Sequence, residues 1–294
     1  MIEKSEIWSR GVVVGVDGSP ESYHAFDWAL AAAARHHATL TVTHARTVPA
    51  GPVSPVPAYD PEQLRAEAQQ VVADALGRIR HDPQDMPEVR SAASIGAPDS
   101  VLTAYSRDVD LVVVGRRGAA GSRHALGSVS AATAAHARGP VAIVPTGAQG
   151  PTPERVVVGI GFDDDPTAAL DLAFSEADRS GCPVVLVHAV QPATQVAHEA
   201  GPVQDEDVEA ALRGLASRWT TTYPEVECLL RTRPGDAAEA LLDEVTASDL
   251  LVLGGHRHRR FLGRLLGSVP DALLGEAPCV VTVVHTDRPH PHED

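Results

Sequence analysis

Five short segments from the first half of the chain return in the same order in the second half. Gly11–Val16 (GVVVGV) returns as Arg155–Ile160 (RVVVGI), 144 residues later, and Leu40–Ala45 (LTVTHA) returns as Val184–Ala189 (VVLVHA) at the same offset. Further along, the segments DLVVVG, GSV and PVAIV return as DLLVLG, GSV and PCVVT. Because an ordered internal repeat indicates one structural unit used more than once, we expect this chain to fold as two copies of one domain.

The connector between the two halves is the segment 147–153, which reads GAQGPTP. Proline and glycine at this density are typical of the links between domains rather than of a helix or strand. The total of 294 residues is also the length of two domains of ordinary size. We therefore expect one domain at residues 1–148 and a second at residues 149–294.

Within each half, short β-branched runs alternate with helical stretches. Continuous apolar runs suit strands that are buried on both faces of a parallel sheet. Ser19 followed by Pro20 predicts the start of the first helix, and Asp165 with Pro166 repeats that pattern. The sequence therefore predicts the α/β class, with two tandem doubly wound domains, each a five-stranded parallel sheet of the flavodoxin or Rossmann type. The first half is expected to have strands at 11–16, 39–44, 89–95, 111–114 and 141–144, and helices at 20–36, 61–80, 98–107 and 128–137.

Charge and composition exclude several classes of function. The net charge of −15 disfavours nucleic acid as a partner, because a phosphate backbone repels an acidic surface. The three cysteines form no CxxC pair, which argues against a disulfide framework or a zinc site. No apolar run approaches the ~18 residues of a membrane span, so no membrane partner and a cytoplasmic location are expected. Lys4 is the single lysine, so an anion site would need arginine, backbone N–H groups and hydroxyls.

A glycine-rich loop, GRRGAAGSRHALGS, links the fourth strand of the first half to the following helix at residues 115–128. Glycines allow close backbone approach and positive φ, and a helix start adds free N–H groups, so this arrangement suits a phosphate. Arg116, Arg117 and Arg123 could neutralise the phosphate charge, and Ser128 could cap the helix or bind a phosphate oxygen. The alternative is a flexible connector with solvated arginines. In an open α/β sheet, ligands bind at this edge, where the strand order reverses.

Three motifs resemble the universal stress protein family: the VDGSP turn after the first strand, the DLVVVGRRG strand, and the LGSVS helix start. The resemblance is to the tandem two-domain form and covers residues 10–145 and 154–285. It implies a sheet in the order 3-2-1-4-5, with ATP, alone or with magnesium, bound at the point of strand reversal. It also implies association through the last strand, which gives either a homodimer or a monomer whose halves mimic one. Nucleotide-binding members carry G-x2-G-x9-G-[S/T] after the fourth strand.

In the first half, this resemblance implies a nucleotide site formed by three strand ends and the glycine loop. Asp17 would lie beside the adenosine, and the backbone at Ala45 would contact adenine. The loop departs from the family pattern, because eight residues rather than nine separate Gly118 from Gly127. The ten residues implied to contact the nucleotide are Gly15, Val16, Asp17, Ala45, Val114, Gly115, Gly118, Gly127, Ser128 and Val129.

The second half keeps the spacing but loses key residues. Arg257 stands where the second glycine is expected, and a turn with positive φ would be strained there. Gly161 replaces Asp17, and the carboxylates of Asp163–Asp165 either cap the next helix or need a cation beside a phosphate. The first half is therefore expected to hold the better site. His44 and His188 end equivalent strands and are expected to pack. The second-half contacts implied by the resemblance are Gly159, Ile160, Ala189, Leu253, Gly254, Gly267, Ser268 and Val269.

Three functions remain open at this point. The first is a nucleotide-responsive regulatory protein of the stress response that binds ATP, with at most slow hydrolysis. The second is a nucleotide-free scaffold that acts through contacts with a protein partner, which the sequence does not identify. The third is an adenine-nucleotide hydrolase similar to the ATP pyrophosphatases, whose SGGxDS loop has more glycine than the VDGSPES turn here. The chain has no HExxH or Walker motif and no nucleophile–base pair that we can assign, so we expect no catalytic residues and no metal site.

Overall fold

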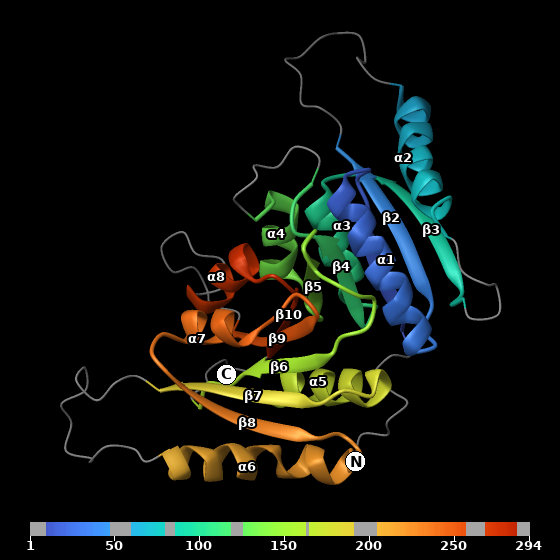
Figure 1. The fold of residues 1–294 in the computed structure, drawn as a ribbon. Helices are drawn as coiled ribbons and strands as arrows, with labels where there is room; N and C mark the ends of the chain where they lie inside the picture. Colours follow the sequence, from blue (N-terminus) through green and yellow to red (C-terminus); the bar gives the residue numbers. More distant parts are fainter. Residues whose placement is uncertain are drawn as a thin grey trace, which may run out of the picture. The chain divides into compact units, whose positions relative to one another are not determined.

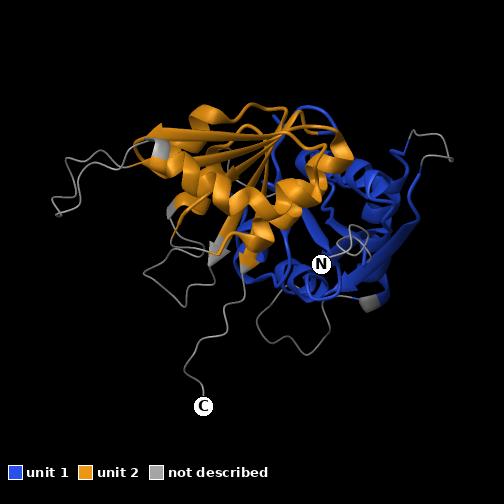
Figure 2. Cartoon of the chain, turned by 90° about the horizontal axis from the view of Figure 1, so that it is seen from below, with its two compact units in different colours: residues 1–152 blue, residues 153–294 orange. Residues whose placement is uncertain are grey.

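The computed structural model describes residues 10–47, 60–79, 86–118, 126–162, 165–190, 205–256 and 268–286. The chain divides into two compact units, residues 1–152 and 153–294 (Figure 2). Both units alternate strand and helix along the sequence (Figure 1). No helix within the described ranges is long and apolar enough to cross a membrane.

The first unit is a five-stranded parallel sheet with helices on both faces. Its strands lie in the order β3-β2-β1-β4-β5, so the order reverses between β1 and β4. Helix α1 packs on β1 and β4, while α3 and α4 pack against each other (Figure 1). The elements are β1 (Val12–Gly15), α1 (Pro20–Arg35), β2 (Leu40–Arg46), α2 (Pro61–Leu76), β3 (Val89–Ile95), α3 (Pro98–Tyr105), β4 (Leu111–Gly115), α4 (Ser128–His136) and β5 (Val141–Val144).

The second unit repeats this architecture. Its parallel strands lie in the order β8-β7-β6-β9-β10, which is again 3-2-1-4-5 within the unit. The predicted fold class, two doubly wound α/β domains in tandem, is confirmed. The elements are β6 (Arg155–Gly159), α5 (Thr167–Ser180), β7 (Val184–Val190), α6 (Asp205–Thr222), β8 (Cys228–Pro234), α7 (Ala237–Glu244), β9 (Asp249–His256), α8 (Ser268–Glu276) and β10 (Val280–Thr286).

The helix starts follow local capping chemistry. The Ser19 side chain accepts a hydrogen bond from the Ser22 N–H at 3.1 Å, and Pro20 takes the first helical position, as predicted. In the second unit, Asp165 Oδ1 accepts from the Thr167 N–H at 3.0 Å. Helix α5 begins at Thr167, so the expectation that Pro166 would occupy the first helical position is wrong by one residue.

The duplication extends to how the first strand of each unit packs. A Cβ on Gly15 would lie 3.1 Å from Leu102 Cδ1, and a Cβ on Gly159 would lie 2.9 Å from Leu241 Cδ1. Both leucines belong to the third helix of their unit and are buried. The glycine at the end of the first strand therefore makes room for the same apolar contact twice. In the first unit, this contact positions α3 beside the carboxyl ends of the strands.

Candidate functional site

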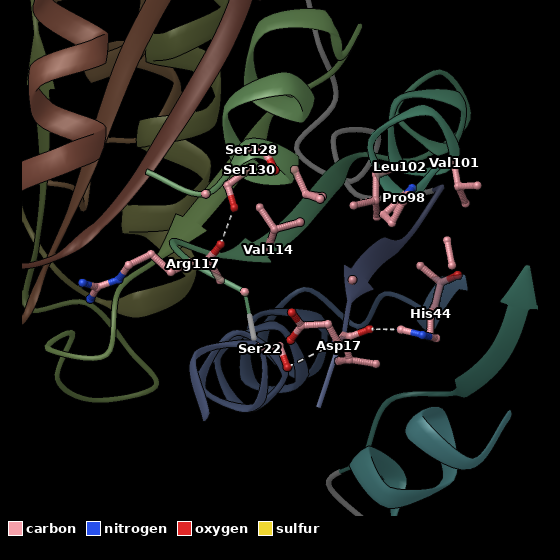
Figure 3. A pocket seen from close by; sticks show the side chains of 18 residues that line it. Asp17, Ser22, His44, Pro98, Val101, Leu102, Val114, Arg117, Ser128 and Ser130 are labelled. Atoms are coloured by element: carbon pink, nitrogen blue, oxygen red, sulfur yellow. Dashed lines mark hydrogen bonds between the residues drawn. The ribbon is translucent and has the colours of Figure 1, made fainter. Parts of the chain in front are cut away.

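The first unit contains a cavity of about 320 Å³ at the carboxyl ends of β1, β2 and β4 (Figure 3). This is the edge at which the strand order reverses and where open α/β sheets bind ligands. All ten first-half residues singled out from the sequence line this one cavity: Gly15, Val16, Asp17, Ala45, Val114, Gly115, Gly118, Gly127, Ser128 and Val129.

The cavity has an apolar wall that the sequence analysis missed. Pro98, Val101 and Leu102, from the first turns of α3, line it opposite the strand ends (Figure 3). Helix α3 carries the chain back from β3 toward β4, so its start must pass the ends of β2 and β1. The predicted topology could have indicated this wall. The other lining residues that the sequence analysis did not assign to the site are Ser22, Thr43, His44 and Ser130.

The opposite side of the cavity is rich in backbone N–H groups. Gly127 is the N-cap of α4, at φ −65° and ψ 148°, and no side chain caps this helix start. The Ala131 N–H bonds to the Gly127 carbonyl, so the preceding N–H groups, from Ser128 to Ser130, have no partner within the helix. The alternative of Ser128 as the cap is therefore wrong, because Ser128 occupies the first helical position. A helix start of this kind attracts anions.

Two hydrogen bonds hold α4 against the end of β4. The Ser130 hydroxyl donates to the Gly115 carbonyl at 2.7 Å, and the Gly127 N–H donates to the Arg116 carbonyl at 2.9 Å. Residues 119–125 between them, including Arg123, lie outside the described part of the chain. The two ends of the glycine loop are thus fixed to the same point of the sheet, which keeps the N–H groups of α4 at the cavity.

Asp17 lies at the cavity between α1 and the glycine loop. Its Oδ1 accepts from the Ser19 N–H at 3.0 Å, and its own N–H donates to Ser22 Oγ at 3.2 Å. A Cβ on Gly118 would lie 2.5 Å from Asp17 Oδ2. The φ angle of Gly118 is not positive. The expected reason for a glycine there is therefore wrong: a side chain at Gly118 would displace the Asp17 carboxylate, and φ imposes no requirement for glycine.

Arg117 does not direct its charge into the cavity. Its guanidinium and its backbone N–H bind the Glu21 carboxylate, at 2.5 Å for both Nη2 to Oε1 and N to Oε2 (Figure 3 shows the side chain leading away). Thr146 Oγ1 donates to the same Oε1 at 2.8 Å. Arg117 also lines the cavity, so neutralisation of a phosphate by Arg117 stays a prediction. Its contacts with Glu21 fix the direction in which the loop leaves β4.

The Glu21 carboxyl is shifted toward its charged form. Burial raises its pKa, but the hydrogen bonds from Arg117 and Thr146 and the positive charge of Arg117 outweigh this effect. The pKa of Glu21 therefore lies below its ordinary value. The Glu21 side chain is 10% exposed and that of Arg117 is 26% exposed, so water screens this pair only in part.

Two histidines make the same contact in the two units. His44 Nδ1 lies 2.6 Å from the Val16 carbonyl, and His188 Nδ1 lies 2.8 Å from the Ile160 carbonyl. A carbonyl only accepts, so each Nδ1 carries the hydrogen. These bonds join the ends of the first two strands, which agrees with the expected structural role. His44 also lines the cavity, and His188 packs against the Phe162 ring with centroids 4.4 Å apart.

The second unit lacks the polar network of the first. At the positions equivalent to Glu21 and Arg117, it has Thr167 and His256, while Thr286 corresponds to Thr146. Pro270 replaces Ser130, which removes both the hydroxyl and one N–H from the start of α8. Gly159 ends β6 and Ile160 follows it. Ala189 lies in β7, Leu253 and Gly254 lie in β9, and Ser268 and Val269 begin α8. Gly267, Arg257, Asp163 and Asp164 lie outside the described residues.

Known proteins resemble this chain over nearly its full length. The model of the universal stress protein family matches it twice, at residues 9–145 and 153–285. A universal stress protein of Mycolicibacterium smegmatis is 35% identical, over 93% of this chain and 96% of the relative. One from Mycobacterium tuberculosis is 33% identical over the same shares. A solved universal stress protein from Archaeoglobus fulgidus has a TM-score of 0.66 at 17% identity, covering 94% of this chain and 98% of its own, and this likeness shows the fold.

Substitution of Gly115 by alanine should destabilise the protein by about 1–3 kcal/mol, the usual cost of overpacking. A Cβ there would lie 2.9 Å from the Glu21 backbone carbon, which cannot move without displacing α1. At the equivalent Gly254, no atom of a described residue lies within 4 Å of such a Cβ, so Gly254→Ala is the matched control and should be nearly neutral. Urea denaturation followed by circular dichroism measures both, and equal effects would contradict this account.

The variant Glu21→Gln should be less stable than the parent by roughly 1–3 kcal/mol near pH 7. A carboxyl with a lowered pKa in the folded state stabilises above its unfolded pKa, and that stability is lost as the pH falls through the folded pKa. The difference between the two proteins should therefore shrink below about pH 4.5. Glu88→Gln is the control, because Glu88 pairs with Arg90 at the surface and its loss should matter little. A pH-independent difference for Glu21→Gln would refute the assignment.

Proposed function

The chain belongs to the universal stress protein family, and from that premise we propose that its first unit binds ATP in the cavity described above. One observation carries the proposal: the ten residues that the family motifs single out in the first half all line a single cavity. Segments as far apart in sequence as Gly15 and Val129 contribute to it.

The two sides of the cavity match the two ends of a nucleotide. Val16, Ala45, Pro98, Val101 and Leu102 form an apolar wall that suits a planar base. The N–H groups at the start of α4, which have no partner within the helix, lie on the other side and suit the phosphates. Asp17, between these two sides, carries the carboxylate that would accept hydrogen bonds from the ribose hydroxyls.

Magnesium would enter this site with the phosphates. No group of three His, Cys, Asp or Glu side chains in the described ranges could hold a metal ion. Asp17 offers one carboxylate at the cavity, too few oxygen ligands for a resident cation. The protein's contribution to a bound magnesium would thus be limited to placing the phosphate oxygens.

The residues around the cavity favour a regulatory ligand over a rapidly consumed substrate. Phosphoryl transfer needs cations to offset charge that develops on the phosphate oxygens. The Arg117 guanidinium is already bonded to Glu21, and His44 Nδ1 is bonded to the Val16 carbonyl. Bound ATP would instead stabilise the conformation that surrounds it, with consequences for a partner that recognises that conformation.

We expect the two units to be unequal. The second unit has Gly161 where Asp17 would be, and Pro270 removes one of the N–H donors at the start of α8. The run Asp163–Asp165 adds carboxylates to the turn that corresponds in sequence to the Asp17 turn of the first unit. Each change weakens the attraction for a nucleotide, so tight binding should occur at one site per chain.

Isothermal titration of the full chain with ATP tests this proposal and should give about one tight site. Asp17→Ala should weaken binding roughly tenfold, the effect of losing a hydrogen bond to a charged group. Gly118→Ala should also weaken it, because the new methyl group would displace the Asp17 carboxylate. Asp165→Ala, which removes a carboxylate from the equivalent turn of the second unit, is the control and should leave the tight site unchanged.

Two negative results together would contradict the proposed binding of ATP. Absence of heat, together with absence of a thermal shift at millimolar ATP, would exclude nucleotide binding. A scaffold that acts through protein contacts would then remain as the function.

A further inference from the structure

The cavity floor contains a polar atom whose role neither the fold nor the polar network explains. Thr43, in β2, is 2% exposed, and its Oγ1 is buried without a hydrogen bond to any described residue. Buried hydroxyls are almost always hydrogen-bonded, because an unpaired one loses its interactions with water and gains none in return. Thr43 also lines the cavity, so a molecule held there would lie next to it.

Strand register shows which way the Thr43 side chain points. β1 and β2 are parallel neighbours, with Gly15 paired to Thr43, so the Cβ positions of this pair lie on the same face of the sheet. A Cβ on Gly15 would point at Leu102 Cδ1, 3.1 Å away, and at Val114 Cγ1, 3.4 Å away. That face is the one beneath α3. Thr43 therefore lies on the apolar side of the cavity, on the face of the sheet where Leu102 packs against Gly15.

The surroundings define what the hydroxyl could recognise. Val16, Ala45 and the α3 residues present apolar groups, and the Nδ1 of neighbouring His44 is already bonded to the Val16 carbonyl. A threonine hydroxyl both donates and accepts, so it can pair with a ring nitrogen or an exocyclic amino group. One rotation about χ1 exchanges its hydroxyl for its methyl group at the cavity wall.

We propose that Thr43 is a specificity-determining residue of the first unit, whose hydroxyl hydrogen-bonds the polar edge of the bound base. This inference rests on the proposed binding of ATP. It assigns a side chain, rather than backbone alone, to base recognition. It also gives the buried Oγ1 the hydrogen bond that the described residues do not provide.

The duplicated unit shows that the fold does not need this hydroxyl. Val187 occupies the equivalent position in β7, where it pairs with Gly159 as Thr43 pairs with Gly15. Valine has the shape of threonine without the polar atom, and Val187 is 2% exposed, as Thr43 is. Thr43→Val therefore changes the chemistry of the cavity floor while keeping a packing arrangement that the chain already uses.

The test compares ATP with inorganic triphosphate, which lacks the base, by titration of the full chain. Thr43→Val should weaken ATP binding about five- to tenfold, the effect of one hydrogen bond, and should leave triphosphate binding unchanged. Thr43→Ser, which keeps the hydroxyl, should stay within about threefold of the parent for ATP. Thr133→Val is the matched control, because the Thr133 hydroxyl is equally buried and unpaired among the described residues but does not line the cavity. It should bind ATP as the parent does.

Three results would overturn the inference about Thr43. These are unchanged ATP affinity in Thr43→Val, an equal loss in Thr133→Val, and an equal loss of ATP and triphosphate binding, which would indicate a distorted loop. Melting curves of the empty variants verify that each remains folded. If the parent chain itself binds no ATP, the proposed function fails and the inference fails with it, a result distinct from these three.

Discussion

The close contact between Gly115 and the first turn of α1 is the feature on which the rest of the site depends. A Cβ on Gly115 would lie 2.9 Å from the Glu21 backbone carbon, so only glycine lets α1 approach the end of β4 this closely. The approach brings the Glu21 carboxylate to the backbone N–H and guanidinium of Arg117, and Ser130 bonds the Gly115 carbonyl from the other side. The strand end, the loop and α4 are thereby held around one cavity.

The two units separate what the fold requires from what the site requires. Both contain the glycine-to-leucine contact at the end of the first strand and the histidine that bonds a backbone carbonyl of the first strand's end. These contacts, found in both units, belong to the shared fold. The second unit has no counterpart of Glu21 or Arg117 and no hydroxyl in place of Thr43 or Ser130. A few side chains at the switch point therefore distinguish the first unit from the second.

Most of the fold could be predicted from the sequence because local sequence patterns determine its strands and helices. The buried strands and the Ser19 cap follow from apolar runs and capping chemistry, while the ten residues at the strand ends were implied by the family motifs. The direction of Arg117 could not be predicted, since its partner Glu21 is 96 residues away. The reason for Gly118 depends on Asp17, which is also far away in the sequence. Helix α2 was expected to reach residue 80 but ends at Leu76, with Gly77 as its C-cap.

A crystal structure of the full chain grown with a non-hydrolysable ATP analogue tests the central claim most directly. The account predicts that the base lies in the first unit against Val101 and Leu102, with its edge at Thr43. It also predicts that the phosphates lie at the N–H groups of Ser128, Val129 and Ser130. An empty first-unit cavity at saturating analogue, or a nucleotide bound in the second unit alone, would contradict it.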